Sequence, residues 1–285
     1  MTEPLLSIRD LRTVFHTDEG LVRAVDGVSF DVGRGETVCL VGESGSGKTV
    51  TGESITRLIR MPPGEIAGGE IVFDGRDLTG LSDAELRDLR GDRIAHVFQN
   101  PQGALNPVYT VGWQIVEAIQ LHQDVAGAEA RSRGIDLLDR VGIPEATRRF
   151  DDYPHEFSGG MKQRVSIAMA LATNPDLLIA DEPTTALDVT IQNQILGLLD
   201  ELQAEFDMSI LLITHDLGVV AEVADRVVVM YAGKVMERGD VFDLFERPSH
   251  PYTRALLDCL PGRGDDGASS IGGKLPSPTD PPDGC

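Results

Sequence analysis

Cysteine and long apolar runs are scarce in this 285-residue chain, and both absences narrow the classes of protein it can belong to. The three cysteines, Cys39, Cys259 and Cys285, lie far apart and form no C-x-x-C pair, so we expect no disulfide framework, which fits a reducing cytoplasm. Cys39 is interpreted as a small buried hydrophobe. No run of about 18 apolar residues occurs, so no transmembrane helix is predicted, and the first residues show no secretory signal.

Positive charge, and lysine above all, is also in short supply. The chain has 25 basic and 46 acidic residues, which gives a net charge of −21 and a pI near 4.5. We expect no nucleic-acid partner, because a strongly negative surface repels phosphate backbones. Four of the basic residues are lysines and 21 are arginines. This balance favours a protein from a salt-accumulating halophile, although a GC-rich genome encoding an acidic surface is an alternative.

Glycine, in contrast, is plentiful, and one glycine-rich stretch organises the chain. Residues 42–49 read Gly-Glu-Ser-Gly-Ser-Gly-Lys-Thr, follow the apolar run 37–41 and precede a segment with helical character at 50–60. This is the strand, G-x-x-x-x-G-K-[ST], helix pattern of a phosphate-binding P-loop. Backbone N–H groups and the helix N-terminus bind the phosphates, Lys48 neutralises their charge, and the Thr49 hydroxyl is placed to ligate Mg²⁺. The nucleotide-binding residues predicted here are Gly42, Glu43, Ser44, Gly45, Ser46, Gly47, Lys48, Thr49 and Val50.

The remaining patterns predict an α/β fold with an antiparallel β part. Strands are expected within 5–32, with a turn at 18–20, and at 37–41, 69–75, 93–98, 177–180, 209–213, 226–230 and 234–237. Helices are expected at 82–89, where Ser82 and Glu85 form a capping box, and at 111–122, 127–142, 160–173, 190–205, 240–246 and 250–258. The helices within about 101–175 are interpreted as an inserted helical subdomain, with Trp113 packing in its core. Residues 1–260 form the predicted domain, and 261–285 a poorly ordered Gly/Pro/Asp-rich tail.

Polar groups follow four of the predicted strands at the point where each strand ends. They are the P-loop, Gln99, the pair Asp181 and Glu182, and His215. Strand ends are often polar simply because they meet solvent, but in open α/β sheets ligands bind at these ends, so we expect all four around one nucleotide. Asp181, with Thr49 and Gln99, would hold Mg²⁺. Glu182 would act as the base for the attacking water, and His215 would stabilise charge on the γ-phosphate.

A second glycine pair begins another helix. Ser158, Gly159 and Gly160 precede the helical pattern that runs to residue 173, which makes a second anion site at a helix N-terminus. One nucleotide does not need two such sites from one chain, whereas a head-to-tail dimer does. In such a dimer each ATP lies between the P-loop of one subunit and residues 158–160 of the other. The alternative is an N-cap followed by a flexible hinge.

Together these motifs resemble those of ABC-type ATPases across nearly the whole chain. Residues 42–49 resemble the Walker A loop, Gln99 the Q-loop, 157–161 the signature motif, 177–182 the Walker B strand, 186–188 the D-loop and His215 the switch histidine. The signature here ends in Met161, where many members have glutamine. The resemblance implies a P-loop NTPase of ABC type with a mixed sheet, an antiparallel β part and an inserted helical subdomain, which hydrolyses ATP with Mg²⁺. Phe15 lies where the family places an aromatic on adenine, although it could equally belong to the core.

Within the family, the resemblance is closest to the ATPase subunits of oligopeptide and dipeptide importers. It is carried by residues 100–107, 153–161, 250–257 and 275–285. The resemblance implies two membrane permeases, a second ATPase subunit (identical or different) and, through the permeases, an extracellular solute-binding protein. It also implies a peripheral position on the cytoplasmic side of the membrane. Some relatives continue into a cysteine-rich tail, but this chain reaches only Cys285, and we expect no iron–sulfur cluster.

Other functions compete with peptide import. A soluble ABC ATPase of DNA repair or translation would carry coiled-coil insertions, zinc motifs or tandem domains, and no such pattern is visible. A structural, non-hydrolysing nucleotide domain typically lacks the base or the switch residue, whereas Glu182 and His215 are both present. Close relatives of peptide importers carry nickel or sugar, so the solute itself is not determined by these motifs.

Overall fold

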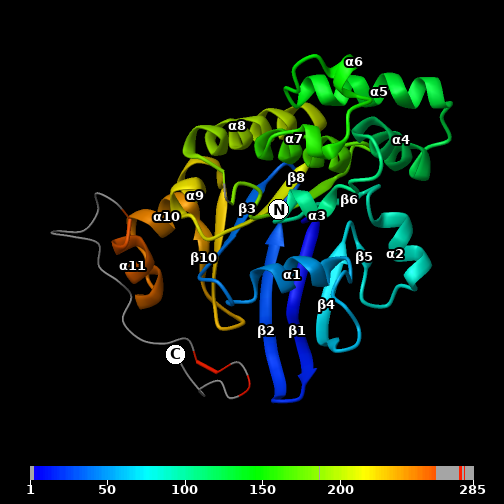
Figure 1. Cartoon of the computed structure of the whole chain (residues 1–285). Coiled ribbons are helices and arrows are strands. Elements are labelled where there is room, and N and C mark those ends of the chain that lie inside the picture. Colours follow the sequence, from blue (N-terminus) through cyan, green and yellow to red (C-terminus); the bar gives the residue numbers. More distant parts are fainter. Residues whose placement is uncertain (1–2, 186, 261–275, 278, 280–285) are drawn as a thin grey trace. The chain divides into compact units, whose positions relative to one another are not determined.

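The computed structural model describes residues 3–185, 187–260, 276, 277 and 279, and it divides into two compact units (Figure 1). The first unit comprises Met1–Leu81 and Leu211–Cys285, and the second comprises Ser82–Ile210. Within the described part of the chain, no helix combines the length and the apolar character needed to cross a membrane. The predicted tail, 261–285, lies almost entirely outside the described residues.

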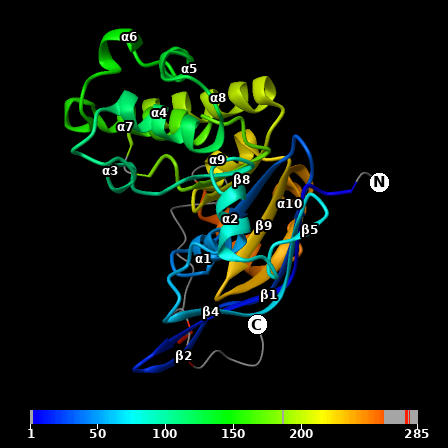
Figure 2. The same ribbon diagram turned by 90° about the vertical axis from the view of Figure 1, so that its right-hand side faces the viewer.

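The first unit contains a four-stranded antiparallel sheet (Figure 2). Its order is β2 (Gly20–Val32), β1 (Leu6–Thr17), β4 (Gly64–Phe73) and β5 (Arg76–Asp77). We predicted a strand at 69–75, but β4 begins five residues earlier because Gly69, at φ 96°, forms an irregularity in the pairing with β1 and does not end the strand. A Cβ at Gly69 would lie 2.6 Å from the backbone of β1, so only glycine fits.

The first unit also contains strands of a mixed sheet, in the order β10 (Lys234–Asp240), β9 (Arg226–Tyr231), β3 (Thr37–Val41) and β8 (Ser209–Thr214). Of β8, the residues from Leu211 onward belong to this unit. β3 and β9 are parallel, and β10 runs antiparallel to β9. All residues of β3 are buried, as expected for a continuous apolar run, and Cys39 is buried as predicted. The helices of this unit are α1 (Lys48–Ile55), α9 (Leu217–Val223), α10 (Val241–Glu246) and α11 (Pro251–Asp258).

The helix after the P-loop is shorter than the sequence pattern predicted. We expected it at 50–60, whereas α1 begins at Lys48 and ends at Ile55. Arg57 adopts a positive φ of 55°, a left-handed conformation that terminates α-helices. Pro62 and Pro63 follow, and proline disfavours helical dihedrals in the residue before it.

The second unit combines two parallel strands with a group of helices. The strands are β6 (Ile94–Val97) and β7 (Leu177–Asp181). The helices are α2 (Asp83–Leu89), α3 (Pro101–Ala104), α4 (Val111–His122), α5 (Gly127–Arg140), α6 (Ala146–Arg149), η1 (Pro154–Glu156), α7 (Gly159–Ala170) and α8 (Val189–Phe206). Ser82 and Glu85 form the predicted capping box of α2. The fold class is therefore confirmed: an α/β protein with a mixed sheet, an antiparallel sheet and a helical part.

Phe150 joins the helices of the second unit. It is 2% exposed, and its ring lies where a Cβ on Gly112 of α4 or Gly134 of α5 would stand, at 2.0 and 2.8 Å. The two glycines therefore make room for the ring, and truncating Phe150 to alanine is expected to cost about 3–5 kcal/mol. The buried face of α4 is formed by Val111, Ile115 and Ile119 rather than by Trp113, which is 43% exposed. The prediction that Trp113 packs in the core was wrong, because it projects from the opposite face.

Candidate functional site

The P-loop lies in the first unit, between β3 and α1. Lys48 is 5% exposed, and its Nζ donates hydrogen bonds to the carbonyl oxygens of Gly42 (2.7 Å) and Glu43 (2.9 Å). The loop thus holds a buried cation against its own backbone, at the positive N-terminal end of α1. A buried ammonium group at this position attracts an anion, and phosphate is the ligand that a helix N-terminus and a lysine bind together.

Neighbouring strands fix the shape of the loop. A Cβ at Gly42 would lie 2.1 Å from the carbonyl oxygen of Met230 on β9, and Gly42 has φ 152°. A Cβ at Gly47, at φ 98°, would lie 2.2 Å from the carbonyl oxygen of Ala24 on β2. The N–H of Gly233, in the turn between β9 and β10, donates to the carbonyl of Ser46 at 3.0 Å. The loop therefore rests on β2 and on the hairpin of β9 and β10, which keeps its backbone preorganised.

Two further residues that the sequence singled out belong to the same unit. Phe15 on β1 is half-buried and lies opposite Gly64 of β4, where it packs closely against the glycine. His215 is exposed directly after β8. The next residue, Asp216, caps α9 by accepting the N–H of Gly218 at 2.8 Å, which defines where the backbone turns after His215. Phe15 and His215 therefore share the P-loop's unit, and their roles toward a nucleotide remain predictions.

The predicted base lies in the second unit, in a network of hydrogen bonds. Glu182 follows β7 with a φ of 44°, and its Oε2 accepts two hydrogen bonds of 2.8 Å, from Nε2 of Gln99 and Oγ1 of Thr185. Gln99 follows β6, the strand that pairs with β7, so adjacent strand ends bring the two predicted residues together. Asp181, the last residue of β7, is 9% exposed. Sequence reasoning missed Thr185, although a hydroxyl three residues after Glu182 was a usable signal for a local turn.

The second predicted anion site is the N-terminus of α7. Ser158 is the N-cap, and its Oγ accepts the N–H of Met161 at 3.3 Å, which is the capping role considered as an alternative. A Cβ at Gly160 would lie 2.9 Å from Ile191 of α8, so the start of α7 packs closely against that helix. Asp188 caps α8 by accepting the N–H of Ile191 at 3.0 Å. Ala186, the first residue of the predicted D-loop, lies outside the described residues.

The two units thus divide the predicted site residues between them. The P-loop, Phe15 and His215 belong to the first unit, and Gln99, Asp181, Glu182 and residues 158–160 belong to the second. The oxygen donors of Thr49 and Asp181 are of the kind that Mg²⁺ prefers, usually with one or two carboxylates and substrate phosphates. The donor chemistry therefore fits the expected metal. The grouping of all these residues around one nucleotide remains a prediction.

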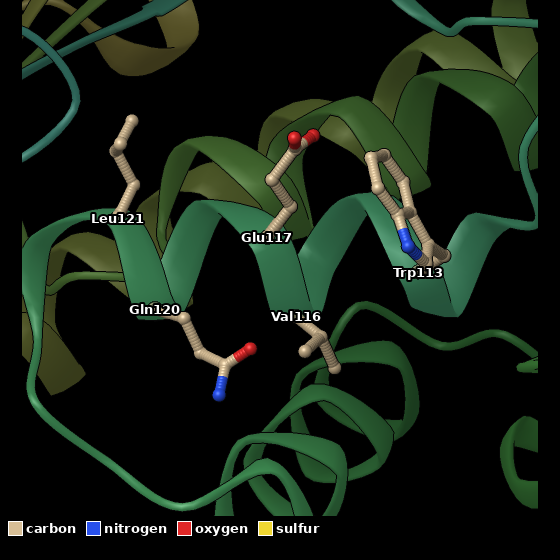
Figure 3. A pocket seen from close by; sticks show the side chains of 5 residues that line it. All are labelled: Trp113, Val116, Glu117, Gln120 and Leu121. Carbon is tan, nitrogen blue, oxygen red and sulfur yellow. The ribbon is translucent and has the colours of Figure 1, made fainter.

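A pocket of about 300 Å³ lies elsewhere, on α4 of the second unit (Figure 3). Trp113, Glu117 and Leu121 project from one side of this helix, one turn apart, and Val116 and Gln120 complete the lining. The ring of Trp113 stacks on Tyr109 at a centroid distance of 4.0 Å, and Leu121 is 72% exposed. We call the exposed Trp113 and Leu121, which lie on either side of Glu117, the apolar stripe of α4. Exposed apolar side chains gathered on one surface are typical of a contact with another protein.

Comparisons with known proteins agree with this geometry. The sequence profile of the ABC transporter family matches residues 25–185, which include the P-loop and β7. The profile described as the oligopeptide/dipeptide transporter, C-terminal region, matches residues 236–285, which include α11. The two matches cover different parts of the chain, so both the nucleotide-binding part and the C-terminal part have known counterparts.

Individual proteins are similar to almost the whole chain. The oligopeptide transport ATP-binding protein OppD of Bacillus subtilis (strain 168) is 53% identical over 283 residues, which are 98% of this chain and 79% of that protein. The dipeptide transport ATP-binding protein DppD of the same organism is 52% identical over 99% of this chain and 85% of that protein. A solved dimeric structure of the ATP-binding cassette MJ0796 in a post-hydrolysis state, bound to ADP and Pi, covers 83% of this chain and 98% of its own, with a TM-score of 0.74 and 29% identity.

Proposed function

This chain belongs to the ABC transporter family, and we propose that it is the ATP-hydrolysing subunit of a membrane importer for di- and oligopeptides. The observation that carries the ATPase role is the carboxylate of Glu182, held by two donors at the end of β7 in a chain that also has a complete P-loop. The peptide substrate is supported by relatives named for oligopeptide and dipeptide transport and by the match at residues 236–285.

The first unit binds the phosphates in this proposal. Backbone N–H groups of residues 42–49 and the Nζ of Lys48 supply positive charge, and the preorganised loop avoids reorganisation when the anion binds. Thr49, Asp181 and Gln99 would hold Mg²⁺, which neutralises phosphate charge when bound. Phe15 would stack on the adenine, and His215 would donate to the γ-phosphate.

The second unit supplies the base. Glu182 would take the proton of the attacking water, and the hydrogen bonds from Gln99 and Thr185 would hold its carboxylate in one orientation. Residues 158–160 would contact the phosphates bound by a second ATPase subunit, so that ATP binding closes the dimer and hydrolysis reopens it. Solved dimers of the ATP-binding cassette MJ0796, 29% and 30% identical to this chain, support pairing with a second ATPase subunit.

The proposed partners are two permeases, a second ATPase subunit and, through the permeases, an extracellular solute-binding protein. The apolar stripe on α4, formed by Trp113 and Leu121 around Glu117, is the surface that we assign to a permease. This assembly would sit peripherally on the cytoplasmic side of the membrane. A soluble role in DNA repair or translation, or transport of nickel or sugar, is not favoured, because relatives 52–53% identical to this chain are named for peptide transport.

The test is purification of the tagged chain from its own host in mild detergent at high salt, with co-purifying proteins identified by mass spectrometry. We expect multi-spanning permeases, and the variant Trp113→Ala with Leu121→Ser should recover less of them, whereas the exposed Val189→Ser on α8 serves as a control outside the stripe. Recovery of ribosomal or DNA-repair proteins without any membrane protein would overturn the transport role and leave the ATPase chemistry standing.

A further inference from the structure

The helix α11 begins at a site held by Glu237, a half-buried carboxylate on β10. Oε1 and Oε2 of Glu237 accept the N–H groups of Ser249 (2.7 Å) and His250 (3.0 Å). Nδ1 of His250, the N-cap, then accepts the N–H of Tyr252 at 3.1 Å. With Pro251 at the first helical position, these bonds leave Tyr252 little freedom to move relative to the hairpin of β9 and β10.

The side chain of Tyr252 reaches from this helix to the P-loop. Its ring packs on the ring of Tyr231 of β9 at a centroid distance of 4.7 Å and an angle of 52°. Its hydroxyl oxygen accepts the backbone N–H of Glu43 at 3.4 Å. Burial raises the pKa of Tyr252 to about 12, so the phenol keeps its proton at neutral pH and accepts this bond as a neutral group.

The same peptide group also faces Lys48. The N–H of Glu43 and the carbonyl of Gly42 belong to one planar peptide unit, and in a trans peptide they point in opposite directions. On one side the N–H meets the Tyr252 hydroxyl, and on the other the carbonyl accepts Nζ of Lys48 at 2.7 Å. A rotation of this peptide would disturb both hydrogen bonds at once. The Tyr252 hydroxyl, by holding the N–H of Glu43, therefore constrains the Gly42 carbonyl that accepts the hydrogen bond from Lys48.

We propose that Tyr252 is a positioning residue for ATP binding, which fixes the Gly42–Glu43 peptide and through it the ammonium group of Lys48. Residues 236–285, matched by the oligopeptide/dipeptide transporter profile, thereby contribute to a nucleotide loop that lies in the separate match at 25–185. The proposal rests on the proposed function, because it assumes that the loop binds ATP. It assigns the C-terminal helix a role in the nucleotide affinity of this chain.

The test compares Tyr252→Phe, which keeps the ring and removes the hydroxyl, with Tyr231→Phe. The control removes the hydroxyl of the neighbouring ring, which has no hydrogen-bond partner among the described residues. Equilibrium binding of ATP to the full chain should weaken about two- to tenfold in Tyr252→Phe, as expected for one hydrogen bond, and stay unchanged in Tyr231→Phe. In turnover assays the KM for ATP should rise while kcat stays the same.

A double-mutant cycle tests the route through Lys48. The changes in unfolding free energy caused by Tyr252→Phe and by Lys48→Met should not add up to the change in the double variant. The changes caused by Tyr231→Phe and by Lys48→Met should add. Unchanged ATP binding in Tyr252→Phe, an equal loss in Tyr231→Phe, or an additive cycle would overturn the proposal. The cycle needs no nucleotide, so it tests the Tyr252–Lys48 link even if the wild-type chain failed to bind ATP, which would overturn the proposed function instead.

Discussion

The amide of Gln99 donates a 2.8 Å hydrogen bond to the carboxylate of Glu182, although the two residues are 83 positions apart. The bond exists because β6 and β7 pair in parallel, so that Val97 lies beside Ala180 and the two strands end together. Thr185 donates to the same carboxylate oxygen. The two donors on Oε2 hold the carboxylate of Glu182 in one orientation at the end of β7.

Glu182→Gln should retain ATP binding and lose turnover. The amide keeps the size of the side chain but cannot accept the proton of the attacking water, so kcat should fall at least about 100-fold. Phosphate release and equilibrium ATP binding, measured on the same preparation, separate the two effects. Full turnover in this variant would remove Glu182 from the role of base.

Thr185→Val should lower kcat more than Thr185→Ser. Valine has nearly the shape of threonine but cannot donate to Oε2 of Glu182, whereas serine keeps the hydroxyl. Loss of one charge-assisted hydrogen bond of about 1.5–3 kcal/mol corresponds to a decrease of roughly ten- to a hundredfold if the bond is fully needed in the transition state. The KM for ATP should not change. Equal kcat values for the two variants would contradict an orienting role for the hydroxyl.

Gly42→Ala should distort the P-loop. The new Cβ would meet the carbonyl oxygen of Met230 at 2.1 Å, and a side chain at φ 152° adds strain on the order of 1–3 kcal/mol. We expect a lower unfolding midpoint together with loss of ATP binding. Gly197→Ala in α8 is the matched control, because nothing lies within 4 Å of its Cβ, and it should stabilise the chain by about 0.5–1 kcal/mol. Wild-type ATP affinity in Gly42→Ala would show that the loop tolerates displacement from β9.

Acid should loosen α11 through Glu237. Partial burial raises the pKa of this carboxyl, but hydrogen bonds that include the N–H groups of Ser249 and His250 outweigh it, and the net pKa is lowered from 4.5. A lowered folded-state pKa means that the stabilisation is complete above the unfolded value and is lost as the pH falls through the folded value. The difference in unfolding free energy between wild type and Glu237→Gln should therefore be constant near neutrality and vanish in acid. A difference that grows below pH 4.5 would have the wrong sign.

Salt should stabilise the chain. With 46 acidic and 25 basic residues, repulsion between like charges exceeds what ion pairs such as Arg9–Asp31 (2.7 Å) recover, and added ions screen that repulsion. The temperature of the unfolding midpoint should rise as the KCl concentration is increased from about 0.1 M to about 1 M. At the higher concentration the screening length falls to about 3 Å. If the thermal midpoint and the ATPase rate both peak below about 0.2 M KCl, the hypothesis that this protein is adapted to a saline cytoplasm is wrong.

Local patterns predicted the elements well, because their causes lie within a few residues. Ser82 with Glu85 set the start of α2, and apolar spacing gave α4 its bounds of 111–122. The predictions were wrong where residues far away in the sequence determine the local structure. Gly69 looked like a strand start, but the backbone of β1 makes it part of a longer strand. Trp113 was assigned to the core because aromatic residues are usually buried, and the opposite face of α4 proved to fill that space.

The candidate site shows the same division. The sequence predicted Lys48 from the P-loop motif, and Gln99 and Glu182 because each follows an apolar strand. It gave no role to Tyr252, whose hydroxyl meets the N–H of Glu43 across 209 positions of the chain. Thr185 is an intermediate case. Its partner Glu182 is only three residues away, but a hydroxyl at this spacing can form several different local hydrogen bonds, so the sequence alone did not predict this one.

The hydrogen bonds from Ser249 and His250 to Glu237, which hold the start of α11, also determine where this protein can be shortened. A chain cut after residue 260 retains α11, and with it the phenol beside the P-loop, whereas a chain cut after residue 249 has lost both. If Tyr252 positions the nucleotide loop as proposed, the shortest piece with full ATP affinity extends past β10 through both α10 and α11. A fluorescent or affinity tag joined behind Leu260 should report on the molecule without disturbing its nucleotide loop.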